Sequence, residues 1–202
     1  RRAPHQNLTV PLHRGDTWVA GTPGNRYGVR LTNTTGQRVL VVLSVDGINA
    51  VTGETANPSQ GGYVLEAWES AEISGWRKSM DDIAQFVFTD LGDSYAARTG
   101  RPRNVGVIGV AVFEESRPRY YPSPMPPIAR GREYERDEAK AAAPAAGAMN
   151  EAAADSSAQR QSMGTGHGQR EWSPVGQTNF VRASRSPAQL TQLRYDDAYR
   201  LV

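Results

Sequence analysis

The residues that could carry out chemistry are few and widely spaced along the chain. There are three histidines, His5, His13 and His167, and there is no cysteine. A thiolate zinc site and a cysteine nucleophile are therefore excluded. No two histidines have the i, i+4 spacing of a helical metal pair, and Glu171 is the nearest acidic neighbour of His167. We therefore predict no metal site and no cofactor.

Two further patterns suggest catalysis but lack the context that catalysis needs. The run Gly-Thr-Gly-His-Gly at 164–168 resembles a phosphate loop. Neither a Lys-Ser/Thr pair nor a ribose-binding acid follows it at the required position, so we interpret it as flexible linker. Serine, histidine and aspartate are all present, but no Gly-x-Ser-x-Gly elbow occurs. Glu114 and Glu115 would point to opposite faces of a strand, which argues against a glycosidase pair.

Large aromatic residues are the more informative feature. Trp18, Trp68, Trp76 and Trp172 are four large rings in a chain with 8% aromatic residues. Exposed on a β-sheet, such rings can stack on sugars or anchor a protein partner, although packing inside the core is the more common role. The pair Trp76-Arg77, beside Gly75 at a predicted strand end, is the best candidate for a ligand-facing site. The predicted binding residues are Trp76, Arg77, Trp68, Tyr63 and Asp46.

The elements that would position these residues are short strands and tight turns. Residues 26–33 alternate between apolar and polar side chains, as in a half-buried strand. Residues 39–45 and 105–113 are apolar on both faces and are predicted as central strands. Asp46-Gly47 is the strongest turn signal in the chain and should require a positive φ at Gly47. Residues 94–98 predict a short helical turn that Gly100 and Pro102 end.

Composition divides the chain into three parts. Residues 1–115 are predicted to form the main part of an antiparallel β-sandwich. Residues 116–165 are rich in proline and alanine and predict a linker or long low-complexity insert. Residues 166–202, with predicted strands at 170–173, 178–182 and 190–195, are too few to bury a core and should complete the same sandwich. The fold class expected is therefore mainly β, with short helical turns.

The net charge and the lengths of the apolar runs exclude some classes of function. The net charge is only +2, and no basic stripe is visible, so nucleic acid is not an expected partner. No apolar run approaches the ~20 residues that a transmembrane helix needs. The chain begins with Arg1 rather than methionine. We take this as a sign of a processed or trimmed form from which a signal peptide could have been removed.

A series of short motifs gives a family resemblance. It runs from Ser44-Val45-Asp46-Gly47 through Gly62-Tyr63-Val64-Leu65, Gly75-Trp76-Arg77-Lys78-Ser79 and Ala84-Gln85-Phe86-Val87-Phe88 to Asp93-Ser94-Tyr95-Ala96-Ala97-Arg98 and Asn104-Val105-Gly106-Val107-Ile108-Gly109. This order resembles a family of exported proteobacterial proteins of unknown function, over residues 25–115 and more loosely 164–195. The resemblance implies a bacterial protein of the periplasm, cell envelope or extracellular space. Because the family has no established activity, it supplies no catalytic residues to carry over to this chain.

Three functions remain open at this point. The favoured one is a non-catalytic envelope β-sandwich that binds a protein partner or self-assembles. Residues 7–12, which are strand-like, could pair with the sheet of another subunit. The alternatives are an envelope hydrolase acting on carbohydrate or ester, and a carbohydrate-binding module that uses tryptophan faces.

Overall fold

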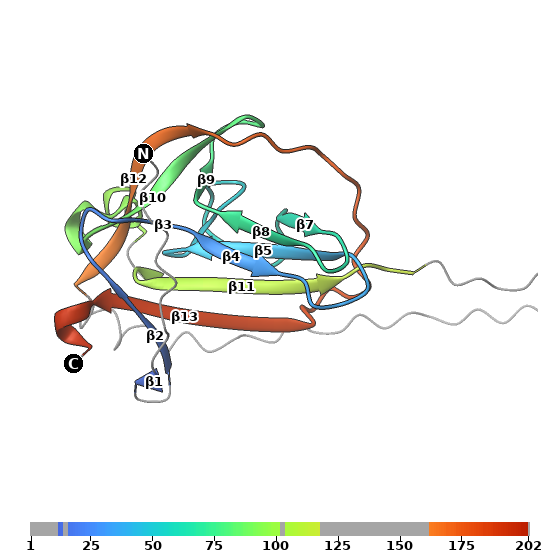
Figure 1. The fold of residues 1–202 in the computed structure, drawn as a ribbon, viewed down its shortest axis with the longest axis horizontal. Helices are drawn as coiled ribbons and strands as arrows, with labels where there is room; N and C mark the ends of the chain where they lie inside the picture. Colours follow the sequence, from blue (N-terminus) through green and yellow to red (C-terminus); the bar gives the residue numbers. More distant parts are fainter. Residues whose placement is uncertain (1–11, 14–15, 102–103, 118–161, 202) are drawn as a thin grey trace, which may run out of the picture.

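The structure is a computed structural model that describes residues 12–13, 16–101, 104–117 and 162–201. Figure 1 shows that strands are the main regular structure of this described part. They form three sheets in which every strand pair is antiparallel except β2 with β13. The predicted mainly-β, sandwich-like class with short helical turns is therefore confirmed.

The largest sheet has seven strands in the order β1-β2-β13-β11-β5-β6, with β7 also paired to β5. Its strands are β1 (Leu12–His13), β2 (Asp16–Gly21), β5 (Val39–Val45), β6 (Ile48–Asn49), β7 (Tyr63–Leu65), β11 (Val107–Glu114) and β13 (Gln189–Asp197). Of the predicted pairing segment 7–12, only Leu12 lies within the described residues, and β1 pairs with β2 of the same chain.

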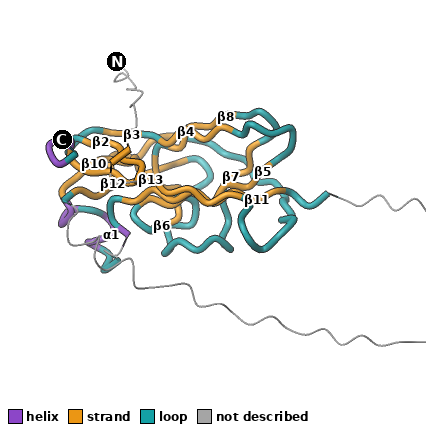
Figure 2. Tube along the Cα trace, turned by 90° about the horizontal axis from the view of Figure 1, so that it is seen from below, coloured by secondary structure: helices purple, strands orange, loops and turns teal. Residues whose placement is uncertain are grey.

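Two smaller sheets complete the fold. The four-stranded sheet contains β3 (Arg26–Tyr27), β9 (Gly75–Arg77), β10 (Asp82–Asp90) and β12 (Met163–Trp172), and the two-stranded sheet contains β4 (Val29–Thr32) and β8 (Ser70–Ile73). The helical pieces are α1 (Tyr95–Arg98) and two 3₁₀ turns, Leu91–Asp93 and Ala198–Arg200. In Figure 2, β4 and β8 form a layer over β5, β7 and β11.

The centre of the large sheet is built by β5 and β11, as their two-sided apolar sequences predict. Alternate residues of β5 enter different clusters: Leu43 packs in the main core between the layers, whereas Leu40 packs on the opposite face. On that opposite face Phe113 of β11 lies directly across from Leu40 and is 1% exposed. Apolar burial on both faces explains why this stretch is almost continuously hydrophobic.

Two local predictions were wrong. Residues 26–33 form not one strand but two, because the chain changes partner at Gly28: β3 pairs with β10 and β4 pairs with β8. The predicted strand at 178–182 is absent apart from a single bridge between Arg182 and Glu115. The Asn179 carbonyl accepts from the Arg38 side chain at 2.7 Å rather than from a neighbouring strand, and the backbone bonds from Ser116 N to Val181 O and from Ala183 N to Glu114 O flank the single bridge.

The glycine-rich run at 164–168 is also not linker but the first half of β12. Small residues are required because neighbours approach closely: a Cβ on Gly164 would lie 2.4 Å from Cβ of Ser94, and one on Gly168 would lie 2.6 Å from Cγ2 of Val87. Glycine here serves close packing rather than flexibility.

The C-terminal strands pair with strands from the first half of the chain. β12 pairs with β10, and β13 lies between β11 and β2. Figure 1 shows the two long C-terminal strands alongside these earlier elements. Most of the predicted linker, residues 118–161, lies outside the described residues.

Candidate binding surface

A buried polar network surrounds the Asp46 carboxylate. Asp46 and Gly47 have φ of 53° and 71°, so both occupy the left-handed region that a tight hairpin turn between β5 and β6 requires. Oδ1 accepts hydrogen bonds from the Tyr195 hydroxyl at 2.5 Å and from Gly106 N at 2.8 Å, and Oδ2 accepts one from Thr165 N at 2.7 Å. The network therefore joins the turn to β12, to β13 and to the start of β11.

The hydroxyl groups of this network have one consistent direction of donation. Tyr195 gives its single proton to Asp46, so it must accept from Thr165, 2.5 Å away. Thr165 in turn accepts from the Tyr27 hydroxyl at 2.6 Å. Burial raises the pKa of Asp46 to about 6, although hydrogen bonds from Tyr195, Thr165 and Gly106 oppose this rise. Because Asp46 is 1% exposed, its role is to hold elements together rather than to meet a ligand.

The predicted pair Trp76-Arg77 does not face a ligand in the way expected. Trp76 is 1% exposed and packs edge-on against Phe86, with 4.8 Å between ring centroids. Arg77 is half-buried and donates to the Ser173 carbonyl at 2.5 Å, which ties β9 to the end of β12. Tyr63 is half-buried on β7. The five predicted binding residues therefore do not converge on one site.

Trp68 is the predicted residue that does present itself to solvent. Its side chain is 69% exposed, and its φ is 63°. Glu69 N donates to Glu66 O at 3.1 Å, which closes a turn over 66–69. The φ angle is positive at Trp68 but not at Ala67, which is the geometry of a type II turn. Trp68 therefore occupies the third position of the turn, where glycine is strongly preferred.

Surrounding contacts hold this strained turn in place. The backbone N of Trp68 donates to Thr35 O at 3.2 Å, and Glu66 N donates to the Glu69 carboxylate at 2.6 Å. The buried side chain of Asn33 donates to Glu66 O at 2.8 Å. The turn is therefore rigid, and it displays an indole that contributes little to the core.

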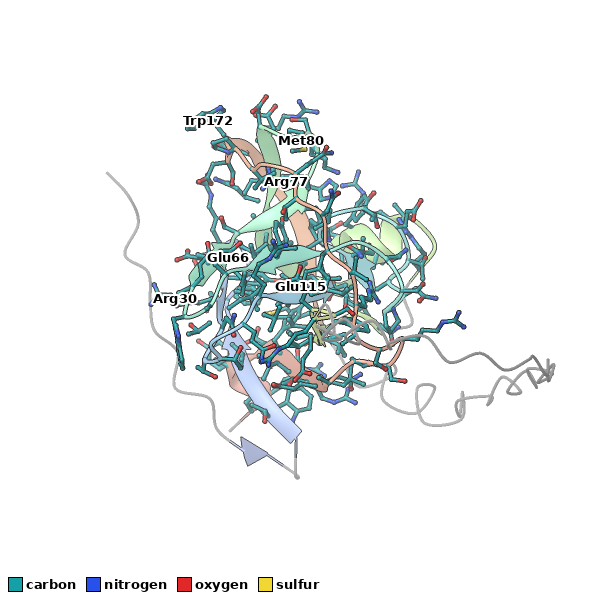
Figure 3. All side chains as sticks on the ribbon, turned by 90° about the vertical axis from the view of Figure 1, so that its right-hand side faces the viewer. Arg30, Glu66, Arg77, Met80, Glu115 and Trp172 are labelled. Atoms are coloured by element: carbon teal, nitrogen blue, oxygen red, sulfur yellow. The ribbon has the colours of Figure 1, made fainter. Side chains whose placement is uncertain are left out.

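The loop that contains Thr35, which accepts the hydrogen bond from Trp68 N, leads into β5. An open hollow of about 420 Å³ lies beside the start of this strand. It is lined by Gln37, Arg38, Glu115, Ser116 and Arg117. Arg38 organises it through ion pairs of 3.7 Å to Glu66 and 3.5 Å to Glu115, whose side chains are labelled in Figure 3. The Arg38–Glu66 pair links the hollow directly to the turn that carries Trp68.

An exposed apolar residue, Val181, is hydrogen-bonded to Ser116, one of the residues that line the hollow. Val181 is 66% exposed, and its carbonyl accepts from Ser116 N at 2.7 Å. Trp68, the charged hollow and Val181 together form what we call the Trp68 surface. Sequence reasoning found Trp68 but missed Arg38 and Glu115. The carboxylates that pair with Arg38, those of Glu66 and Glu115, come from distant parts of the chain, so no local sequence pattern pointed to this group.

The remaining exposed tryptophan belongs to a different region. Trp172 is 73% exposed and lies near Met80, 40% exposed, at the tip of β10 and β12 (Figure 3). Across the described ranges, no ring contact pairs Trp68 or Trp172 with another aromatic side chain.

The described part of the chain offers neither a candidate metal cluster nor a candidate membrane-spanning helix. Within residues 12–13, 16–101, 104–117 and 162–201, no group of three or more acidic or histidine side chains could hold a metal ion. In the same described part, no helix has the length and hydrophobicity needed to cross a bilayer. Comparison of the chain with protein-family models, curated proteins and solved structures finds no match.

Proposed function

We propose that this chain is a non-catalytic binding domain of the bacterial cell envelope that docks a protein partner on the Trp68 surface. The observation that carries the proposal is the conformation of Trp68. An exposed indole in a position that favours glycine costs on the order of 1 kcal/mol of backbone strain. Strain of this kind at an exposed residue is typical of functional sites.

The gain on binding would exceed that cost. Covering the exposed indole removes on the order of 100 Å² of apolar surface from water, worth roughly 2–3 kcal/mol at about 25 cal/mol per Å². Tryptophan and arginine are the residue types most enriched among the dominant contacts of protein interfaces. Here Trp68 and Arg38 are linked through Glu66, which supports a protein partner over a sugar.

The experiment is site-specific photo-crosslinking in intact cells. A benzophenone amino acid replaces Trp68 in one variant and Trp172, an equally exposed indole elsewhere, in the control. We expect a discrete adduct from position 68 that is lost when Arg38→Ala is added, and no such adduct from position 172. An adduct of twice the 22.0 kDa chain mass would identify a second copy as the partner.

Two outcomes would reject the proposal. Equal labelling from both positions would mean that contact at position 68 is nonspecific. Retardation by soluble glycans in affinity electrophoresis, abolished by Trp68→Ala and without any protein adduct, would favour the carbohydrate-binding alternative.

The envelope location stays a prediction from the sequence, and fractionation of the source cells would test it.

A further inference from the structure

A second group of residues, which shares no member with the Trp68 surface, gathers cations around two stacked rings. The rings of Tyr95 and His167 stack with centroids 3.9 Å apart and an interplanar angle of 24°. Lys78 Nζ lies 5.4 Å from the Tyr95 centroid, and the Arg101 guanidinium carbon lies 5.8 Å from it. These residues, with Arg98, form what we call the Tyr95 cluster.

Three separate elements bring the cluster together. Lys78 follows β9, and its backbone N donates to Asp82 O at 2.9 Å in the β9–β10 connection. His167 lies on β12, opposite Phe86 of β10. Tyr95 and Arg98 lie on α1, which Ser94 caps by accepting from Ala97 N at 3.1 Å. The convergence is therefore a product of tertiary structure.

The C-terminal end of α1 positions Arg101, the remaining cation of the cluster. Gly100 has φ of 72° and donates its N–H to Ala97 O at 3.1 Å, while Arg101 N donates to Ala96 O at 2.7 Å. This pair of bonds is the Schellman arrangement, which positions the residue after the glycine. The Arg101 side chain also donates to Gly53 O at 3.4 Å, so it cannot move freely away from Tyr95.

Charge in the cluster is unbalanced. No described carboxylate forms an ion pair with Lys78, Arg98 or Arg101. The pKa of His167 is lowered to about 4 by partial burial and by the nearby positive charges of Lys78 and Arg98. Lys78, Arg98 and His167 are accessible to solvent. At neutral pH the cluster therefore presents three positive charges and an uncharged imidazole with no acidic counterpart.

From this geometry we infer that the Tyr95 cluster binds an oxyanion, a phosphate or sulfate group, between Lys78, Arg98 and the edge of His167. Ammonium and guanidinium groups are the standard donors to such oxygens, and the charges of both Lys78 and Arg98 act on His167. The imidazole offers one N–H donor when neutral and a second when protonated. This inference is independent of the Trp68 surface and of the partner proposed for it.

The test uses the histidine itself as the reporter. Imidazole resonances of the whole chain are followed by NMR as a function of pH, first in chloride and then in sulfate at matched ionic strength. Sulfate stays dianionic across the titration, so its own charge does not change. His167→Gln identifies the His167 signal among the three histidines.

We expect sulfate, but not chloride, to raise the pKa of His167 by about one unit, the smaller end of the effect of an opposite charge at ~4–6 Å. In chloride, Lys78→Met with Arg98→Met should raise that pKa by removing positive neighbours, and it should abolish the response to sulfate. The matched control replaces Arg30 and Arg185, two exposed arginines outside the cluster, and should leave the response intact. Thermal melting of both double variants serves as the control that each of them still folds.

A further arm identifies the source of the oxyanion. Sedimentation with phosphatidylglycerol vesicles, lost in the Lys78→Met and Arg98→Met variant and absent with phosphatidylcholine, would indicate a lipid headgroup. A sulfate response without sedimentation would indicate a free or small-molecule oxyanion. The inference is overturned if sulfate shifts all three histidines equally, or if the response persists in the variant lacking Lys78 and Arg98. Either result would leave the crosslinking test of Trp68 unaffected.

Discussion

At the scale of single residues, the same side-chain type has opposite roles in this chain. Trp76 is buried against Phe86, whereas Trp68 is held in solvent by a strained turn. The sequence predicts Asp46 as a turn residue and a binding residue, but its buried carboxylate accepts three hydrogen bonds within the chain. Stability measurements on single variants should separate these roles.

Asp46 should make stability depend on pH. Its pKa is raised from 3.8 to about 6 in the folded state. Between these values the folded chain binds the proton more tightly than the unfolded chain, so this contribution is present below pH 4 and is lost as pH rises through 6. The loss is on the order of 2–3 kcal/mol, at about 1.4 kcal/mol per pKa unit.

Asp46→Asn provides the comparison, because an amide does not titrate. Urea unfolding of both proteins from pH 4 to 7 gives the difference in unfolding free energy, in which contributions of other carboxylates largely cancel. We expect the original chain to lose stability relative to the variant as pH rises. A difference that stays constant over this range would mean that Asp46 has an ordinary pKa.

Substitution of the two tryptophans should have opposite effects on stability. Trp76→Ala removes a buried indole and should cost about 3–5 kcal/mol. Trp68→Gly relieves the positive φ and should leave the free energy of unfolding unchanged or raise it by up to about 1 kcal/mol. Denaturant unfolding monitored by far-UV circular dichroism measures both. A loss above ~2 kcal/mol in Trp68→Gly would assign Trp68 to folding and remove the main support for a binding role.

At the scale of elements, two strands illustrate different reasons for their sequences. β5 is apolar because both of its faces are covered, while β12 is rich in glycine because Ser94 and Val87 approach its backbone. The first reason is visible as a hydrophobic pattern. The second depends on neighbours that lie far away in the sequence.

The central strands should be sensitive to truncation of their side chains. Leu43 and Phe113 are each 1% exposed and lie on opposite faces of the sheet. Leu43→Ala and Phe113→Ala should each lower the free energy of unfolding by roughly 2–5 kcal/mol. Equilibrium denaturation gives the values, and a loss below ~1 kcal/mol at either position would contradict its place in the core.

Glycine in β12 should resist even the smallest side chain. In Gly164→Ala, the new methyl would lie 2.4 Å from Cβ of Ser94, which caps α1, so we expect a loss of roughly 1–3 kcal/mol from overpacking. Gly176→Ala is the control, because nothing lies within 4 Å of a Cβ there. Thermal unfolding of the two variants should differ clearly, and equal midpoints would show that β12 can shift without cost.

At the scale of the whole molecule, the order of strands determines how the chain must close. β13 lies between β2 and β11, so the large sheet is continuous only when the C-terminal part is present. Met163 and Tyr195, 1% and 0% exposed, also contribute to the main core. The entropy of closing a loop grows only logarithmically with its length, so a long intervening segment does not prevent this arrangement.

A chain ending at residue 117 should therefore fail to fold. Such a chain lacks β12 and β13, so the edges of β10 and β11 would be exposed and the main core would lose the buried Tyr195 side chain. We expect no cooperative thermal transition and strong binding of a hydrophobic dye. A truncated chain that unfolds cooperatively with the midpoint of the full chain would mean that residues 1–117 form a domain by themselves.

The sequence by itself determined the features that depend on local pattern. The two-sided apolar stretches of β5 and β11, the positive φ at Gly47 and the α1 turn ended by Gly100 were all predictable. Each arises from residues within a few positions of one another, where the backbone preferences of glycine and the period of a strand act directly.

Only the tertiary structure decided which side chains meet. Whether Trp68 or Trp76 is exposed, whether the 164–168 glycines bend or pair, and whether Lys78 approaches Tyr95 depend on contacts between residues far apart in the chain. The parallel pairing of β2 with β13 is of the same kind. Burial and charge are properties of neighbours in space, and a strand's own period does not specify which neighbours those will be.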